Sequence, residues 1–130
     1  MDNSQRLGSL AELKVATDAT AKGWHVFLSV SGKSPYDLHL YKDGLSLRVQ
    51  VKGCKKATGV SYIFRLESGH KKKLLDLTSC DVMAFYMEED DLVHYTILSK
   101  TATRKRLRSS DACSLDVLEA QLRERNPDLT

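Results

Sequence analysis

No apolar run in this 130-residue sequence approaches the roughly 18 residues that a membrane-spanning helix needs. The opening stretch, MDNSQRLGSLAEL, also lacks the basic head and the apolar body of a secretory signal peptide. Cysteine is scarce, and the three thiols of Cys54, Cys80 and Cys113 are widely spaced, which fits neither a disulfide framework nor a structural zinc site. We therefore expect a cytoplasmic protein without membrane contact.

Internal repeats, low-complexity tracts and long linkers are absent as well. The contents of 42% hydrophobic and 28% charged residues are ordinary for a soluble protein, which excludes the disordered, collagen and coiled-coil classes. A chain of this length suits one domain around one core. We expect a single domain that spans residues 1–130.

Two helices are predicted, one near each end of the chain. Apolar residues recur at helical spacing from about Gln5 to Lys22, where Gly23 supplies a stop, and Ser114 is placed to cap a final helix that ends before Pro127. Alternating or β-branched runs predict strands between these helices, at about residues 24–30, 37–41, 46–52, 60–66, 81–87 and 92–99. This order predicts an α+β domain with the helices packed on a mostly antiparallel or mixed sheet.

The second and third predicted strands form a hairpin. The pair Asp43-Gly44 lies between them, and Asp-Gly between alternating strands is a strong signal for a two-residue turn, which fixes the register. Counting outward from this turn gives the facing pairs Lys42 with Leu45, Tyr41 with Ser46, His39 with Arg48, and Asp37 with Gln50.

One face of this hairpin is unusually polar. Directly opposed residues have Cβ atoms roughly 5 Å apart, so Asp37 and Gln50 are close enough to share a ligand, and Lys52 projects from the same face. A hairpin whose polar face simply meets water gives the same pattern. The pair of His39 and Arg48 is open to two interpretations in the same way, as a phosphate contact or as a cross-strand polar pair.

Basic residues are clustered, although the net charge is only +3. The segment KTATRKRLRSS contains no acidic residue, and GCKK and HKKK add further lysines, so the clusters are candidate phosphate contacts or merely solvated loops. The candidate nucleic-acid contacts are Arg48, Lys55, Lys56, Arg104, Lys105, Arg106 and Arg108.

Three segments taken in order resemble the PD-(D/E)xK nuclease superfamily, in particular its small branch of endonucleases associated with group I introns. They are GSLAELKVATDATAKGWHVF, SPYDLHLYKDG and LRVQVKG, which together run from about Gly8 to Gly53. Each motif is weak when taken singly, and their ordered combination is much stronger. The resemblance implies a restriction-endonuclease-like core, with the N-terminal helix on a mixed sheet.

The resemblance also implies a site. Glu12 corresponds to the helix carboxylate, Asp37 to the motif aspartate, Gln50 to the (D/E) position and Lys52 to the lysine. Mg²⁺ or Mn²⁺ would then be held by Glu12, Asp37, Gln50 and the carbonyl of Val51. Gln50 departs from the motif, because an amide oxygen ligates a hard cation without the charge that raises affinity.

The chemistry implied is hydrolysis of phosphodiester bonds in double-stranded DNA. A carboxylate-bound Mg²⁺ activates a water and stabilises the developing negative charge, and an adjacent lysine orients or deprotonates that water. One site per chain implies a homodimer or a higher homo-oligomer to cut both strands. The alternatives are a Holliday-junction-resolvase-like nuclease, a DNA-binding module of the same fold without catalysis, and an interaction protein unrelated to nucleic acid.

Overall fold

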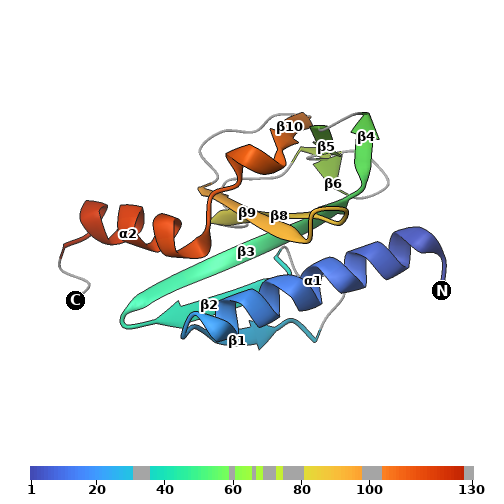
Figure 1. The fold of residues 1–130 in the computed structure, drawn as a ribbon. Helices are drawn as coiled ribbons and strands as arrows, with labels where there is room; N and C mark the ends of the chain where they lie inside the picture. Colours follow the sequence, from blue (N-terminus) through green and yellow to red (C-terminus); the bar gives the residue numbers. More distant parts are fainter. Residues whose placement is uncertain are drawn as a thin grey trace.

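The computed structural model describes residues 1–30, 36–58, 61–65, 67–68, 73–74, 81–97 and 104–127 (Figure 1). Within these ranges two α-helices flank a series of strands. The elements in chain order are α1 (Asn3–Ala21), β1 (His25–Leu28), β2 (Leu38–Lys42), β3 (Leu45–Cys54), β4 (Lys56–Thr58), β5 (Ser61–Arg65), β6 (Glu67–Ser68), β7 (Lys73–Leu74), β8 (Val82–Met87), β9 (Leu92–Ile97), β10 (Arg104–Arg108), a 3₁₀ turn (Ser109–Asp111) and α2 (Leu115–Arg125).

The ends of α1 follow from its sequence. Asp2 caps the first turn by accepting a hydrogen bond of 2.8 Å from the backbone N–H of Gln5, and the Gln5 side chain accepts one from Asp2 in return. After the helix, Gly23 adopts φ +88°, a left-handed conformation that favours glycine. The expected helix of residues 5–22 is thus confirmed, with its start moved two residues toward the N-terminus by the cap.

The main sheet has five strands in the order β1-β2-β3-β8-β9 (Figure 1). Neighbouring strands are antiparallel except for β3 and β8, which run parallel, so the sheet is mixed as predicted. The parallel pair requires a long crossover, and the segment that contains β4 to β7 supplies it. The expected α+β fold, with the N-terminal helix on a mixed sheet, is confirmed.

The turn between β2 and β3 has the predicted geometry. Asp43 and Gly44 have φ values of 44° and 84°, as a two-residue turn of the left-handed type requires. The resulting register pairs Lys42 with Leu45, Tyr41 with Ser46, and His39 with Arg48, as expected.

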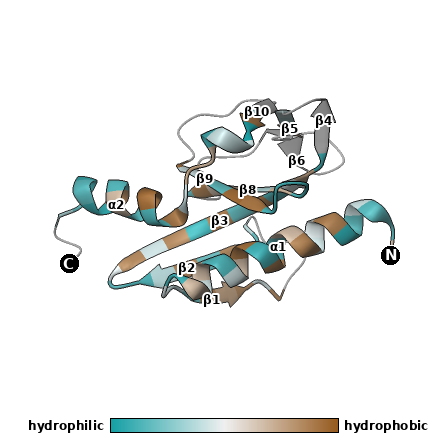
Figure 2. Ribbon diagram, viewed as in Figure 1, coloured by the Kyte–Doolittle hydropathy of each residue, from teal (hydrophilic) through white to brown (hydrophobic). Residues whose placement is uncertain are grey.

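Both faces of the main sheet are covered at β8, which is why all six of its residues are buried. On one face, α1 and α2 pack over apolar residues of β2, β3 and β8, and the alternating hydropathy along β3 is visible in Figure 2. On the other face, Tyr62, Phe64 and Leu107 pack against Met83 and Phe85.

The cover on this second face is a three-stranded sheet in the order β10-β5-β4. It is tied to the turn after β8 by Tyr62, whose hydroxyl donates to Asp90 at 2.5 Å. The predicted strand of residues 60–66 corresponds to β5, whereas β4 and β10 were not predicted. β10 carries one buried apolar residue, Leu107, which is too few for a periodic signal.

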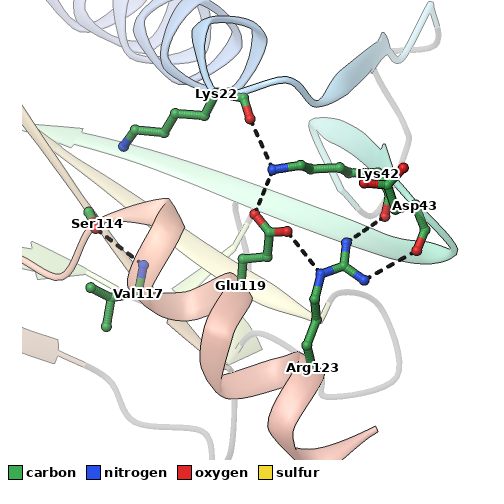
Figure 3. Close-up of polar contacts among 7 residues, drawn as sticks. All are labelled: Lys22, Lys42, Asp43, Ser114, Val117, Glu119 and Arg123. Atoms are coloured by element: carbon green, nitrogen blue, oxygen red, sulfur yellow. Dashed lines mark hydrogen bonds and ion pairs between the residues drawn. The ribbon is translucent and has the colours of Figure 1, made fainter. Parts of the chain in front are cut away.

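Charged groups attach α2 to the β2–β3 turn (Figure 3). Glu119 accepts hydrogen bonds from Lys42 and Arg123, both at 2.9 Å. The Arg123 guanidinium also donates to the carbonyls of Lys42 and Asp43, and Lys42 donates to the carbonyl of Lys22 at the end of α1. We call this group the α2 clamp, because it joins both helices to the closed end of the hairpin.

The remaining expectations agree with the fold in part. Ser114 caps α2 by accepting from the N–H of Val117 at 3.3 Å, and Cys54 and Cys113 are free, half-buried thiols, as expected. Cys80 lies outside the described residues. No helix in the described part of the chain is long and apolar enough to cross a membrane.

Candidate functional site

The site residues gather where β2 begins and β3 runs on past it. The β2–β3 ladder has its last pair at Leu38 and Val49, whereas β3 continues to Cys54 and pairs there only with β8. Asp37 stands at this open edge. Its backbone N–H donates to the carbonyl of Val49 at 2.9 Å, and its carboxylate accepts from the N–H of Val51 at 2.8 Å. Both ends of Asp37 are therefore fixed to β3.

This geometry differs from the expected pairing of Asp37 with Gln50. Asp37 bonds to the carbonyl of Val49, the same residue that pairs with Leu38, so the ladder slips by one residue at this point. The side chain of Asp37 then takes the place of a strand partner for Val51. Asp37 thus contacts the two residues that flank Gln50 rather than facing Gln50 in the ladder.

Glu12 reaches this edge from α1, which packs closely on β3 at Gly53. A Cβ placed on Gly53 would lie 3.1 Å from the Cβ of Ala11 and 3.1 Å from the Cγ of Leu7, so a side chain here would push α1 outward by a few tenths of an ångström. Burial raises the pKa of the adjacent Glu12 carboxyl, and the negative charge of Asp37 raises it further. The two carboxylates are therefore within electrostatic reach of each other.

Lys52 and Gln50 complete the group from the other side of β3. They alternate with Val49 and Val51, whose side chains enter the core, and so project from the opposite face of the sheet. Burial raises the pKa of Asp37, and the hydrogen bond from Val51 and the positive charge of Lys52 offset this only in part. Lys52 is therefore close enough to Asp37 to interact with it.

Three of these side chains form no hydrogen bond or ion pair with the described part of the chain. Within the described residues, Glu12, Gln50 and Lys52 make no side-chain hydrogen bond or ion pair, although each is partly buried. Polar groups in such positions usually find partners in their own protein. The charge interactions place Glu12 and Lys52 near Asp37, and Gln50 precedes Val51 on β3.

The donor set suits a hard divalent cation. It contains two carboxylates, an amide oxygen and a backbone carbonyl, and Mg²⁺ typically binds through one or two carboxylates together with waters and substrate phosphates. No cluster of three or more His, Cys, Asp or Glu side chains that could hold a metal ion occurs in the described ranges. A cation between Glu12 and Asp37 would offset the negative charge of Asp37, which together with burial raises the pKa of Glu12.

Arg48 already has a carboxylate partner. Its guanidinium forms an ion pair with Asp81 at 3.1 Å, and its backbone N–H donates to the same carboxylate at 2.8 Å. Burial acts to raise the pKa of Asp81, but the hydrogen bonds and charge of Arg48 outweigh it and hold that pKa below its usual range. The pair links β3 to the start of β8. Sequence analysis did not find Asp81, because nothing local shows that these two strands are neighbours.

The other predicted phosphate contacts lie on or near the three-stranded sheet. Arg106 and Arg108 are exposed on β10 on either side of the buried Leu107, and Lys55 is exposed between β3 and β4. For Lys56, Arg104 and Lys105 the structure describes only the backbone, in β4 and β10. Lys71, Lys72 and Lys100 lie outside the described residues.

A mixed sheet with a carboxylate on its first helix, and with an aspartate, an amide and a lysine at the open end of its hairpin, defines an α+β domain of the restriction-endonuclease type. The chain belongs to the PD-(D/E)XK endonuclease family, whose model matches residues 2–120. The predicted superfamily is thereby confirmed.

A solved structure with the same fold is a bacterial homing endonuclease, I-Ssp6803I. The match has a TM-score of 0.76 at 18% identity and covers 97% of each chain. This match to a homing endonuclease agrees with the homing branch that the sequence motifs resemble. A search of curated proteins found no match.

Proposed function

We propose that this chain is a metal-dependent DNA endonuclease that hydrolyses phosphodiester bonds in double-stranded DNA. The observation that supports this most directly is the position of Asp37, whose carboxylate is fixed by the N–H of Val51 and lies within electrostatic reach of Glu12 and Lys52. Mg²⁺ or Mn²⁺ would be held by Asp37, Glu12, the Gln50 amide oxygen and the Val51 carbonyl. When bound, such an ion supplies a Lewis acid for the phosphate and lowers the pKa of a coordinated water.

Asp37 is the fixed reference point of this site. Because the Val51 N–H bonds to one of its carboxylate oxygens, the other can face a ligand. Its orientation is set before any ligand arrives, and such preorganisation lowers the cost of binding.

Glu12 is the more adaptable carboxylate. It comes from a different element, and its raised pKa favours proton uptake relative to an ordinary glutamate. It is thus suited to accept a hydrogen bond or a proton from a water beside the phosphate.

Lys52 is the positively charged member of the four proposed site side chains. An ammonium beside Asp37 can donate to a nonbridging phosphate oxygen as negative charge develops there, or can orient the attacking water. Removing it should lower the rate of cleavage more than the affinity for DNA.

A DNA-binding module without catalysis is the second candidate, and Gln50 is the observation that favours it. The amide brings an oxygen donor without a charge, so the site holds one carboxylate fewer than the (D/E) motif provides. The two candidates differ in whether the intact site cleaves DNA at any divalent-metal concentration.

The test is plasmid cleavage. Supercoiled plasmid is incubated with Mg²⁺ or Mn²⁺ and with wild-type protein, Asp37→Ala or Lys52→Ala, and the exposed Asp116→Ala on α2 serves as a matched control. Cleavage by the wild type and by Asp116→Ala alone supports the enzyme. Binding without cleavage under every metal condition supports the module, and absence of both refutes the proposal.

The substrate is proposed to be linear double-stranded DNA, in the manner of a homing endonuclease. A Holliday-junction-resolvase-like nuclease is the alternative within the enzyme class, and equal concentrations of linear and four-way branched DNA distinguish them. A single site per chain also leads us to propose a homodimer or a higher homo-oligomer as the acting form.

A further inference from the structure

Among the described residues, the outer edge of β1 has no strand partner. β1 lies at one end of the five-stranded sheet, paired only with β2 among the described strands. The N–H of Ser29 points inward to the carbonyl of Asp37 at 3.5 Å. Because antiparallel strands alternate in the direction of their N–H and C=O groups, those of Phe27 also point inward. The backbone groups of Val26 and Leu28 therefore face away from the sheet.

This edge has none of the usual protection against pairing with another strand. Lysine, proline, bulges and inward-pointing charges normally serve that purpose. The stretch from Trp24 to Gly32 contains no charged residue apart from a histidine and contains no proline.

The side chains around this edge are apolar and exposed. Of the eight large hydrophobic side chains that are exposed in the described part of the chain, four gather here: Phe27 at 57%, Leu28 at 62%, Val30 at 104% and Tyr41 at 44%. They occur on both faces of the edge, since Phe27 and Tyr41 share one face and Leu28 lies on the other. A four-residue strand alone makes too small an interface, and these flanking groups enlarge it.

A hollow adjoins the protruding side chains. It has a volume of about 470 Å³ and is lined by Phe27, Leu28, Ser29, Tyr36, His39 and Tyr41. A protrusion and a recess side by side on one surface are complementary to the same surface turned through a two-fold axis.

We propose that β1 pairs antiparallel with β1 of a second copy of this chain, so that the two main sheets join into one. The row of unpaired N–H and C=O groups is satisfied by a strand, and an uncharged strand pairs with its own copy without like-charge repulsion. This inference deepens the proposed function, because it assigns the surface through which two single-site chains associate.

The pairing has a geometric consequence for the candidate sites. An antiparallel pair of identical edge strands is related by an axis perpendicular to the sheet, so Lys52 of both copies projects from the same face of the joined sheet. The two β3 strands, which carry Lys52, would lie five strand spacings apart, about 24 Å. Both candidate sites would then face the same side of one joined sheet and could act on a single duplex.

The test compares two leucines of equal exposure. Leu28 on β1 is 62% exposed and Leu13 on α1 is 61% exposed, so Leu28→Lys and Leu13→Lys add the same charge at matched positions. Molar mass is measured by light scattering and sedimentation over a range of protein concentrations, without DNA. We expect wild type and Leu13→Lys at twice the chain mass of 14.6 kDa, and a dimer dissociation constant about tenfold or more higher for Leu28→Lys.

Each other outcome overturns the inference. If the wild type is monomeric at high concentration, the proposed interface does not exist. If the two lysine substitutions change the dimer dissociation constant equally, the effect is a general response to charge. If the mass is unaffected by Leu28→Lys while DNA affinity changes, the surface contacts DNA instead. Circular dichroism confirms that both variants are folded.

Hydrogen exchange of the wild type gives a second measurement that needs no variant. The amides of Val26 and Leu28 should gain protection as the protein is concentrated, and unchanged protection contradicts the pairing. Association is measured without cleavage, so the two proposals fail separately: a dimer that cleaves no DNA refutes the function, and a monomer that cuts refutes the interface.

Discussion

Replacement of Gly53 by alanine tests how closely α1 must approach β3. The added Cβ would lie 3.1 Å from Ala11 and Leu7 side-chain atoms and 3.2 Å from the Leu7 carbonyl oxygen. Two of these three atoms, the Ala11 Cβ and the Leu7 carbonyl oxygen, cannot move without the backbone of α1. The helix must therefore move outward by a few tenths of an ångström to accommodate the methyl group.

Such overpacking typically costs about 1–3 kcal/mol of the free energy of unfolding. For a chain of 130 residues, 1 kcal/mol corresponds to a change in Tm of about 4 °C, so Gly53→Ala should lower Tm by roughly 4–12 °C. Glu12 follows Ala11 on the displaced helix, and a shift of a few tenths of an ångström in its carboxylate should lower the cleavage rate by about three- to tenfold.

Gly8→Ala provides the matched control on the same helix. A Cβ at Gly8 would meet nothing within 4 Å, so alanine there gains helix propensity without a clash. The free energy of unfolding should rise by about 1 kcal/mol, with the cleavage rate unchanged.

The measurements are thermal denaturation by circular dichroism and single-turnover cleavage of plasmid. Opposite signs for the two variants are expected. An unchanged or higher Tm for Gly53→Ala would show that α1 is not held against β3 as the structure indicates, and the reasoning about Glu12 would fail with it.

Three further changes probe charges. Burial raises the pKa of Asp37, so its charged form destabilises the metal-free fold at neutral pH. Asp37→Asn should therefore raise Tm at pH 7 and lose this advantage as the pH falls through the Asp37 pKa. Unlike the wild type, this variant should not gain the stabilisation of about 2.7 kcal/mol expected from Mg²⁺ at 100 times its Kd. Glu119→Gln should lower the free energy of unfolding by about 1–3 kcal/mol at pH 7. Burial acts to raise the Glu119 pKa, but its two cationic partners hold that pKa low, so the deficit should vanish as the pH falls through it, and a deficit that persists in acid contradicts this origin. Arg108→Ala should reduce the slope of log K against log salt for DNA binding by about 0.9, and an unchanged slope argues against a phosphate contact.

The hairpin could be predicted because its information is local. Asp43-Gly44 specifies the turn, the turn specifies the register, and alternation specifies the faces. The prediction held as far as Leu38 and missed the slip at Asp37, which depends on a hydrogen bond from the side chain to the backbone of Val51. Turn chemistry does not contain that information.

The charged contacts could not be predicted because they join distant segments. Arg48 and Asp81 meet only because β3 and β8 are parallel neighbours, and sequence periodicity does not give strand order. The α2 clamp, in which Glu119 on the last helix contacts Lys42 on the hairpin, could not be predicted for the same reason. The catalytic assignment of Glu12 likewise depended on resemblance, because its own pattern fits a surface acid of a helix.

One strand, β3, belongs to both halves of the molecule. Its middle carries the candidate ligands, and beyond Lys55 the same chain continues directly into β4 of the three-stranded sheet. If the arginines of this sheet bind DNA as proposed, strain in a bent duplex would reach Lys52 through the continuous backbone of β3 and β4. We then expect substrates that do not bend to be bound without being cut.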